Sequence, residues 1–219
     1  MKKKLLIVAG VVVVVLIAGL VVVGLSLGKV IKHGVETVGP SLTKTEVKLG
    51  RANLSLLNGH GSLHGFVLGN PEGFKTPSAI KAETVSLGVN PASLMGDKVH
   101  VTHVRVIDPE ITFEGTIGSK NNLNQILANV EAFLGPAKPA EPKKEKDGAT
   151  RKLQVDEFTI RGAKVNLSMT IFGGKSLTVP LPPIKLEKLG QGPEGITGPE
   201  LVGVALKSIT TETLKAAQQ

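Results

Sequence analysis

The stretch NGHGSLHG, from Asn58 to Gly65, combines glycines with two histidines and is the first place where the sequence suggests chemistry. A phosphate-binding glycine loop follows a strand and opens a helix, so that backbone amides and the helix N-terminus meet the phosphate. This stretch lacks the Gly-Lys-Ser/Thr ending of a P-loop, and its glycines read G-x-G-x-x-x-G, which is not dinucleotide-binding spacing. Its apolar residues alternate as in a strand, Asn58-Gly59 is typical of a hairpin turn, and NPEG at 70–73 predicts a second turn. We therefore interpret the stretch as architecture.

The other candidate groups are five histidines and an acidic pair. The histidines are His33, His60, His64, His100 and His103. A metal site needs converging ligands that are themselves oriented by further polar groups, and nothing in the spacing brings these histidines together. Glu110 and Glu114 alternate with apolar residues, as on the outward face of a strand. Because no nucleophile elbow, zinc-protease or kinase signature occurs, the sequence predicts no catalytic, cofactor or metal site, and no enzyme.

Composition narrows the class of partner. The chain has 219 residues, no cysteine, tryptophan or tyrosine, six phenylalanines and a net charge of +8. A basic chain invites a nucleic-acid interpretation because lysine and arginine neutralise phosphates, but single-strand binding also needs aromatic stacking platforms, which are scarce here. Attraction to anionic lipid headgroups is the more natural use of the charge. We expect no nucleic-acid partner.

The N-terminal region predicts a membrane anchor. The run from Leu5 to Leu27 is uncharged, and about 20 apolar residues suffice to cross the hydrocarbon core. It is longer than the apolar part of a signal peptide. Three lysines, Lys2 to Lys4, precede the run, which favours a cytoplasmic N-terminus and a periplasmic remainder. We expect the helix to continue beyond the membrane and to end at Gly39-Pro40, since proline interrupts helices.

These boundaries predict two parts: residues 1–39 as anchor and juxtamembrane helix, and residues 41–219 as one β-domain. Within that domain, residues 136–150 are rich in proline and charge and predict a flexible surface linker. Two amphipathic helices are expected, one in NNLNQILANVEAFLG with an asparagine cap and a glycine stop, and one in GPELVGVALKSITTETLKAAQQ with Pro199 in its first turn. Each needs an apolar surface to cover.

Four strand-like segments share an unusual pattern, in which two alternating apolar residues are followed by a slip of one position and then two more. The four are Val47, Leu49, Ala52 and Leu54; Ile80, Ala82, Val85 and Leu87; Val99, Val101, Val104 and Val106; and Leu153, Val155, Phe158 and Ile160. A slip would turn the apolar set to the wrong face unless an irregularity restores the phase. We expect bulges and a strongly curved sheet; the alternative is that some slips are turns between shorter strands.

The last two of these segments begin a longer sequence repeat. KVHVTHVRVIDPEITFE and KLQVDEFTIRGAKVNLS align without a gap. In each, a strand leads to a turn signal, Asp108-Pro109 or Arg161-Gly162, and then to a second apolar segment. We expect two equivalent hairpins with irregularities near Thr102-His103 and Asp156-Glu157. The predicted fold class is α+β: an N-terminal transmembrane helix, then a curved, bulged, mainly antiparallel sheet covered by two amphipathic helices.

From Lys2 to about Leu134 the chain combines an anchor, an L-x-G…N-P-x-G-F segment, a P-A-S-L-M turn and a strand that ends in D-P-E-I. The residues of these motifs are Leu63, Gly65, Asn70, Pro71, Gly73, Phe74, Pro91, Leu94, Asp108, Pro109 and Ile111. This region, and by repetition Lys152 to Ser168, resembles the N-terminal region of the AsmA-like family. The resemblance implies an inner-membrane protein with a periplasmic domain and a β-groove of the kind found in chorein-type lipid-transfer proteins. It also implies a link to lipid transport and outer-membrane biogenesis, although this chain is short for a bridge across the periplasm.

We therefore expect a non-catalytic, single-pass inner-membrane protein of the cell envelope that handles lipid through an apolar β-groove. Phospholipid acyl chains are the expected ligand. The expected groove or core residues are Val85, Leu87, Val99, Val101, Val104, Val106, Phe158 and Ile160. The alternative is a scaffold that binds other envelope proteins, or further copies of itself, by strand addition or groove contacts. An open apolar trough favours lipid, whereas a trough filled by the protein's own helices favours the scaffold.

Overall fold

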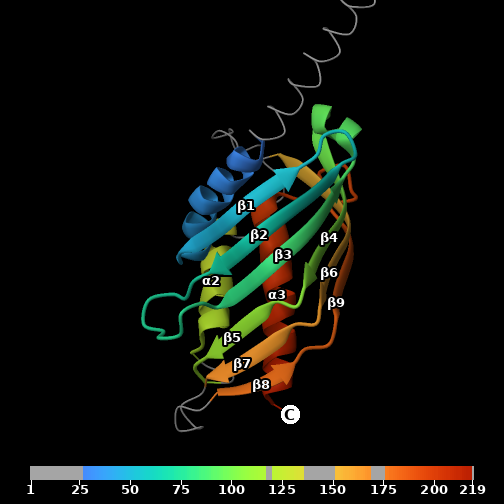
Figure 1. Ribbon diagram of the computed structural model, residues 1–219. Coiled ribbons are helices and arrows are strands. Elements are labelled where there is room, and N and C mark those ends of the chain that lie inside the picture. The colour runs from blue at the N-terminus through green and yellow to red at the C-terminus, as the bar shows by residue number, and fades with distance from the viewer. Residues whose placement is uncertain (1–26, 117–119, 136–150, 169–175, 219) are drawn as a thin grey trace, which may run out of the picture.

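The computed structural model describes residues 27–116, 120–135, 151–168 and 176–218 (Figure 1). The predicted membrane-spanning run, apart from Leu27, and the predicted linker at 136–150 lie outside these residues. Among the helices in the described part of the chain, none has the length and apolar character that a membrane crossing requires.

A mixed sheet of nine strands dominates the described residues. The strands are β1 (Val47–Leu54), β2 (His60–Leu68), β3 (Ile80–Val89), β4 (Lys98–Ile107), β5 (Glu110–Glu114), β6 (Lys152–Arg161), β7 (Lys164–Ser168), β8 (Ser176–Pro180) and β9 (Ile184–Leu189). Their order is β8-β7-β5-β3-β4-β6-β9, with β2 on the other side of β3 and β1 outside β2. The pairs β4/β6 and β5/β7 are parallel and the rest antiparallel. The α+β class is confirmed, with a mixed and open sheet.

The two sequence repeats are not hairpins, and that prediction is wrong. β4 and β5 both pair with β3 in one continuous register, with Val85 opposite Val106 and Ile80 opposite Ile111, so they form a single kinked strand. The second repeat, β6 and β7, runs beside the first in parallel at a constant offset. Asp108-Pro109 produces a kink because Asp108 takes a positive φ of 49° while the chain continues in the same direction.

The same continuity holds at the next position in the sheet. β9 pairs with β6, β8 pairs with β7, and the amide of Leu181 donates to the carbonyl of Ala163 between them. The kinks therefore lie side by side: Asp108 and Gly162, both with positive φ, are adjacent, and the amide of Asp108 donates to the carbonyl of Arg161 at 2.8 Å. A line of bends crosses neighbouring strands, which curves the sheet without breaking its pairing.

The predicted slips all lie inside single strands, β1, β3, β4 and β6, so the alternative of short strands separated by turns is rejected. The pairing of β3 with β4 shifts register at Gly88/Val89, opposite Thr102, as expected. In β1 and β2 the register is kept because the two strands slip at the same level. There Gly50 lies against Gly65, whose φ is +64°, and the pairing on both sides stays in phase.

The two predicted helices are confirmed as α2 (Asn122–Leu134) and α3 (Gly198–Ala217). The side chain of Asn121 caps α2, and Thr197 with Glu200 forms a capping box at α3. A short 3₁₀ helix, η1 (Pro91–Met95), links β3 to β4. Both α-helices lie on one face of the sheet (Figure 1). Side chains that are fully buried between helix and sheet include Phe113, Ile126, Val130, Val155 and Val165.

The N-terminal helix continues to residue 43, so the expected end at Gly39-Pro40 is wrong. Packing and side-chain hydrogen bonds outweigh the disruption by proline. The hydroxyl of Thr43 donates to the carbonyl of Gly39 at 2.8 Å, and the amide of Lys44 donates to the carbonyl of Pro40 at 3.0 Å. Leu42 is buried in the core, so the last helical turn is held by tertiary contacts.

Candidate binding groove and sheet edges

The eight predicted groove or core residues all belong to one apolar layer on the helix-covered side of the sheet. Five are buried: Val85, Val101, Val104, Phe158 and Ile160. The other three, Leu87, Val99 and Val106, are half-buried and pack against the same core.

Pairing arranges these residues in rows across the sheet. In one row Val85, Val106, Ile160 and Ile184 lie on successive strands from β3 to β9. In the next row the order is Leu87, Val104, Phe158 and Leu186. Because the rows cross both repeats, the parallel pairing of β4 with β6 creates this surface.

The protein's own helices occupy this surface. α2 and α3 lie across the sheet face in Figure 1, and Ile126 and Val130 of α2 are fully buried there. Phe113 of β5 and Val165 of β7, in the same apolar layer, are also fully buried. The face is therefore a packed core over most of its length, which is the arrangement that favours a scaffold.

A groove of about 440 Å³ lies at one edge of the sheet, between β9 and α3. Its lining residues are Pro183, Ile184, Lys185 and Leu186 from β9 and the turn before it, and Lys207, Ser208, Thr211 and Glu212 from α3. β9 is the last strand on this side, so within the described residues no further strand pairs beyond it. The groove thus adjoins an edge strand.

Charged side chains lie along this edge. The ammonium of Lys185 is 2.7 Å from the carboxylate of Glu187 and 3.8 Å from that of Glu157. The hydrogen bond to Glu187 raises the pKa of Lys185, and the same bond lowers the pKa of Glu187. Across the groove, Glu212 accepts a hydrogen bond from Lys215 at 2.8 Å. Charges on a short edge strand are a common protection against uncontrolled strand pairing.

The opposite edge of the sheet, β1, is closed by the N-terminal helix. The carboxylate of Glu36 accepts a hydrogen bond from the amide of Leu49 at 3.0 Å, and the ammonium of Lys32 donates to the carbonyl of Leu49. The Leu49 amide, followed by the Lys32 hydrogen bond, holds the pKa of Glu36 below its usual value. Gly28 and Gly39 let the helix approach β1, because a Cβ at Gly28 would clash with the carbonyl of Ala52 and one at Gly39 would crowd Val47.

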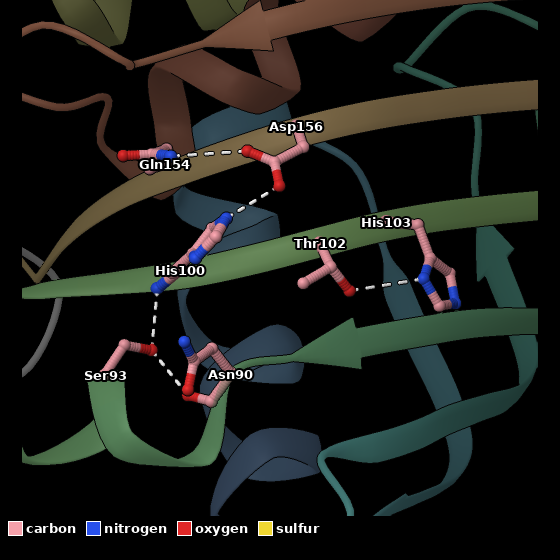
Figure 2. Close-up of polar contacts among 7 residues, drawn as sticks. All are labelled: Asn90, Ser93, His100, Thr102, His103, Gln154 and Asp156. Atoms are coloured by element: carbon pink, nitrogen blue, oxygen red, sulfur yellow. Dashed lines mark hydrogen bonds and ion pairs between the residues drawn. The ribbon is translucent and has the colours of Figure 1, made fainter.

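A polar cluster on β4 and β6 contains a His–carboxylate pair (Figure 2). His100 Nε2 lies 2.7 Å from Asp156 Oδ2, and this hydrogen bond lowers the pKa of Asp156. The hydroxyl of Ser93 accepts from the backbone amide of His100 and donates to the carbonyl of Asn90. Because Ser93 hydrogen-bonds to the backbone of His100 and not to its imidazole, the cluster is not a nucleophile–base arrangement.

The remaining histidines do not join this cluster. His103 lies near the hydroxyl of Thr102, and burial, followed by the charge of Arg105, lowers its pKa. His64 contacts Ser62 and Thr84 on its own and the neighbouring strand. Within the part of the chain that the structure describes, no group of three or more potential ligands that could hold a metal ion occurs.

The glycine-rich region forms the expected turns and also a network that sequence reasoning missed. Asn122 is fully buried and donates to Asn70 Oδ1 and to the carbonyl of Thr112, both at 2.8 Å. Asn70 in turn donates to Thr76. This network ties the β2–β3 loop to the start of α2, so Asn70 has a structural role.

Glu114 completes the network, although its position in the strand pattern predicts only an outward-facing side chain. Its carboxylate accepts from the amides of Lys75 and Thr76 and from the hydroxyl of Thr76. Burial acts to raise its pKa, but these hydrogen bonds outweigh burial and leave the pKa lowered. The Glu114 carboxylate therefore anchors the β2–β3 loop to β5.

No family model, curated protein or solved structure matches the chain. The AsmA-like resemblance therefore stays a prediction that rests on the residues quoted for it.

Proposed function

We propose that the protein is a membrane-anchored, non-catalytic scaffold of the cell envelope that binds a partner protein by strand addition at β9. The observation that carries the proposal is the contrast between a sheet face filled by α2 and α3 and an edge strand, β9, that borders a groove of about 440 Å³. Strand addition supplies backbone hydrogen bonds for affinity, and side-chain pockets beside the edge supply specificity.

The groove defines the chemistry of the partner segment. An extended chain paired with β9 would place alternate side chains toward α3, where Ile184 and Leu186 offer apolar contact. On the α3 wall Lys207 and Glu212 carry charges of opposite sign, and Lys185 is already paired with Glu187 and Glu157. The best-fitting segment is therefore an extended strand whose alternate side chains, those facing α3, are apolar.

Membrane attachment is the second part of the proposal. It rests on the uncharged run from Leu5 to Leu27 and on the lysines before it. In this arrangement the protein is a single-pass protein of the inner membrane with its β-domain in the periplasm. The partner is then another envelope protein or a further copy of the chain.

Lipid handling is a second candidate function, favoured by one observation. Of the eight predicted groove residues, Leu87, Val99 and Val106 are partly exposed, whereas the other five are buried. These three side chains would contact acyl chains if the helices moved apart. Mass spectrometry of lipids that copurify with the full chain tests this candidate, and the absence of bound lipid would count against it.

Site-specific photo-crosslinking in the native membrane tests the scaffold proposal. A crosslinker placed at Lys185 on β9 and, separately, at Ser208 on α3 should give products with the same partner. Thr211→Arg, which fills the groove, should abolish both products. Thr37→Arg, a matched change at an exposed threonine of the N-terminal helix, should leave them intact.

The outcomes separate the alternatives. Different partners at the two positions, or products that persist in Thr211→Arg, would overturn the proposal of strand addition at β9. Mixing two differently tagged copies of the chain shows whether the shared partner is the chain itself.

A further inference from the structure

The described part of the chain begins at one end of the sheet. Gly28, in the first described helical turn, lies against the carbonyl of Ala52 near the end of β1. Val30, in the same turn, is 65% exposed. The apolar run from Leu5 to Leu27 immediately precedes this turn in the sequence, so this end of the domain is the one from which the run departs.

Two further segments meet at this end. The loop at 55–59 joins β1 to β2, and η1 joins β3 to β4; the amide of Val89 donates to the carbonyl of Gly59 between them at 2.8 Å. Figure 1 shows η1 and the β1–β2 turn together at the end of the sheet where the helix begins. Each segment presents a large apolar side chain to solvent: Leu57 is 79% exposed and Met95 is 93% exposed.

Basic residues also lie at this end of the sheet, and Lys98 donates to the carbonyl of Gly192. Lys98 and Lys152 are paired neighbours at the starts of β4 and β6. Arg151 donates to the carbonyls of Leu94 and Gly96 and so holds η1 against the sheet. Lys29 is exposed beside Val30. Asp97 directly precedes Lys98, and Glu194 lies in the loop before α3. The four basic residues therefore outnumber the two acidic ones.

We propose that this end of the domain is a membrane-docking surface, with Leu57 and Met95 inserted among the headgroups of an anionic bilayer. The occupant is the lipid surface from which the anchor run emerges, and it rests on the membrane attachment proposed above. Exposed apolar tips flanked by lysine and arginine are the chemistry of interfacial membrane binding. The docking surface would hold the sheet upright and keep the β9 groove at a fixed height above the bilayer.

The absence of cysteine from the chain gives a direct test. Full chains that carry Leu57→Cys or Met95→Cys are labelled with an environment-sensitive fluorophore and reconstituted in phosphatidylcholine vesicles with and without phosphatidylglycerol. The control is Leu177→Cys, an exposed leucine (50%) on β8 at the opposite end of the sheet. Flotation of the same samples reports membrane attachment independently.

We expect a shift of emission to shorter wavelength and quenching by lipid-borne quenchers at positions 57 and 95, stronger with phosphatidylglycerol, and neither effect at 177. Chains that float while positions 57 and 95 behave like 177 would overturn the docking surface and leave the anchor standing. Chains that do not float would overturn both. Equal quenching at all three positions would also contradict the proposal, because the domain would then have no preferred orientation.

Discussion

The two long edges of the sheet are treated in opposite ways. At β1, a helix lies along the strand, and two side chains of opposite charge, Lys32 and Glu36, satisfy the carbonyl and the amide of Leu49. At β9, whose inner side pairs with β6, no strand within the described residues pairs with the outer side, and the space beside it is the groove lined by α3. The β1 edge is thus closed by hydrogen bonds, whereas the β9 edge is protected only by its charged side chains and its short length.

This difference shows that closing an edge takes more than covering it. A helix has no free backbone groups along its length, so it cannot continue the hydrogen-bond pattern of a strand. The Lys32 and Glu36 pair, spaced four residues apart on one helical face, supplies a donor and an acceptor instead. α3 lines the groove beside β9 with Lys207, Ser208, Thr211 and Glu212, and that edge stays available.

The largest effect is expected in the core that both edges share. Phe158→Asp places a carboxylate among Val104, Leu186 and the helices, where it has no partner. An unpaired buried charge costs several kcal/mol, so we expect the domain to unfold. Val104→Asp should act in the same way. The free energy of unfolding from chemical denaturation of the full chain is the measurement.

Lys164→Asp, at an exposed position of β7, is the control and should change stability by less than about 0.5 kcal/mol. Wild-type stability in Phe158→Asp combined with lost lipid would mean that the floor is a hydrated trough and not a core shared by the two edges.

A matched glycine pair tests how closely the helix must approach β1. In Gly39→Ala the new Cβ would lie 2.9 Å from Val47, so the helix must move and we expect a loss of about 1–2 kcal/mol. In Gly34→Ala, on the same helix, the Cβ meets nothing within 4 Å, and the better helix former should add up to about 1 kcal/mol. Thermal unfolding of both variants is the measurement. Stability changes of the same sign in the two variants would show that the helix is not tightly packed against β1 at Gly39.

The closure of β1 should depend on pH. The pKa of Glu36 is lowered in the fold, so the hydrogen bond to Leu49 contributes fully above the ordinary glutamate value of about 4.3 and is lost as pH falls through the lowered pKa. Hydrogen exchange should report falling protection of the Leu49 amide on acidification, while the Val165 amide in the sheet centre stays protected. Glu36→Gln should remove the pH dependence; if the dependence persists, another group closes the edge.

The smallest effect is expected at the end of β9. Lys188 has a φ of +60°, which favours glycine, so Lys188→Gly should stabilise the domain by roughly 0.5–1 kcal/mol. Lys185→Gly, in the same strand without a positive φ, should destabilise it. Denaturation midpoints of the two variants provide the comparison. A loss of stability in Lys188→Gly would mean that the lysine side chain makes a contact that outweighs the backbone strain.

Local patterns predict α2, α3 and the strands from β1 to β7, but no prediction covers β8 or β9, which form the edge beside the groove. The slip in Val99, Val101, Val104 and Val106 fits either a bulged strand or a turn between shorter strands, and the structure has a single strand there. The direction of the chain after Asp108-Pro109 could not be predicted, since the same residues suit a reversal or a kink. Pairing with β3 decides between them, and that pairing is not local.

The candidate site is also only partly predictable from local sequence patterns. The apolar floor follows from periodicity, but the β9 groove depends on where α3 lies relative to Leu186, a placement that no local pattern contains. The His100–Asp156 contact did have a signal: the gapless alignment of the two repeats sets His100 opposite Gln154, two residues from Asp156. Parallel pairing of the repeats is what turns that alignment into proximity.

The parallel pairing of the repeats also determines how the chain must fold. β1, β2, β3 and the kinked strand β4–β5 are antiparallel neighbours joined by short links, so this half can assemble from nearby segments. β6, in contrast, must pair with β4 across α2 and the whole of residues 136–150. Such long-range pairing raises contact order and slows folding. Until β6 pairs with it, β4 is bonded only to β3 and its other side is unpaired. A half-folded chain therefore has a temporary edge in the middle of the future sheet, where another nascent chain can pair.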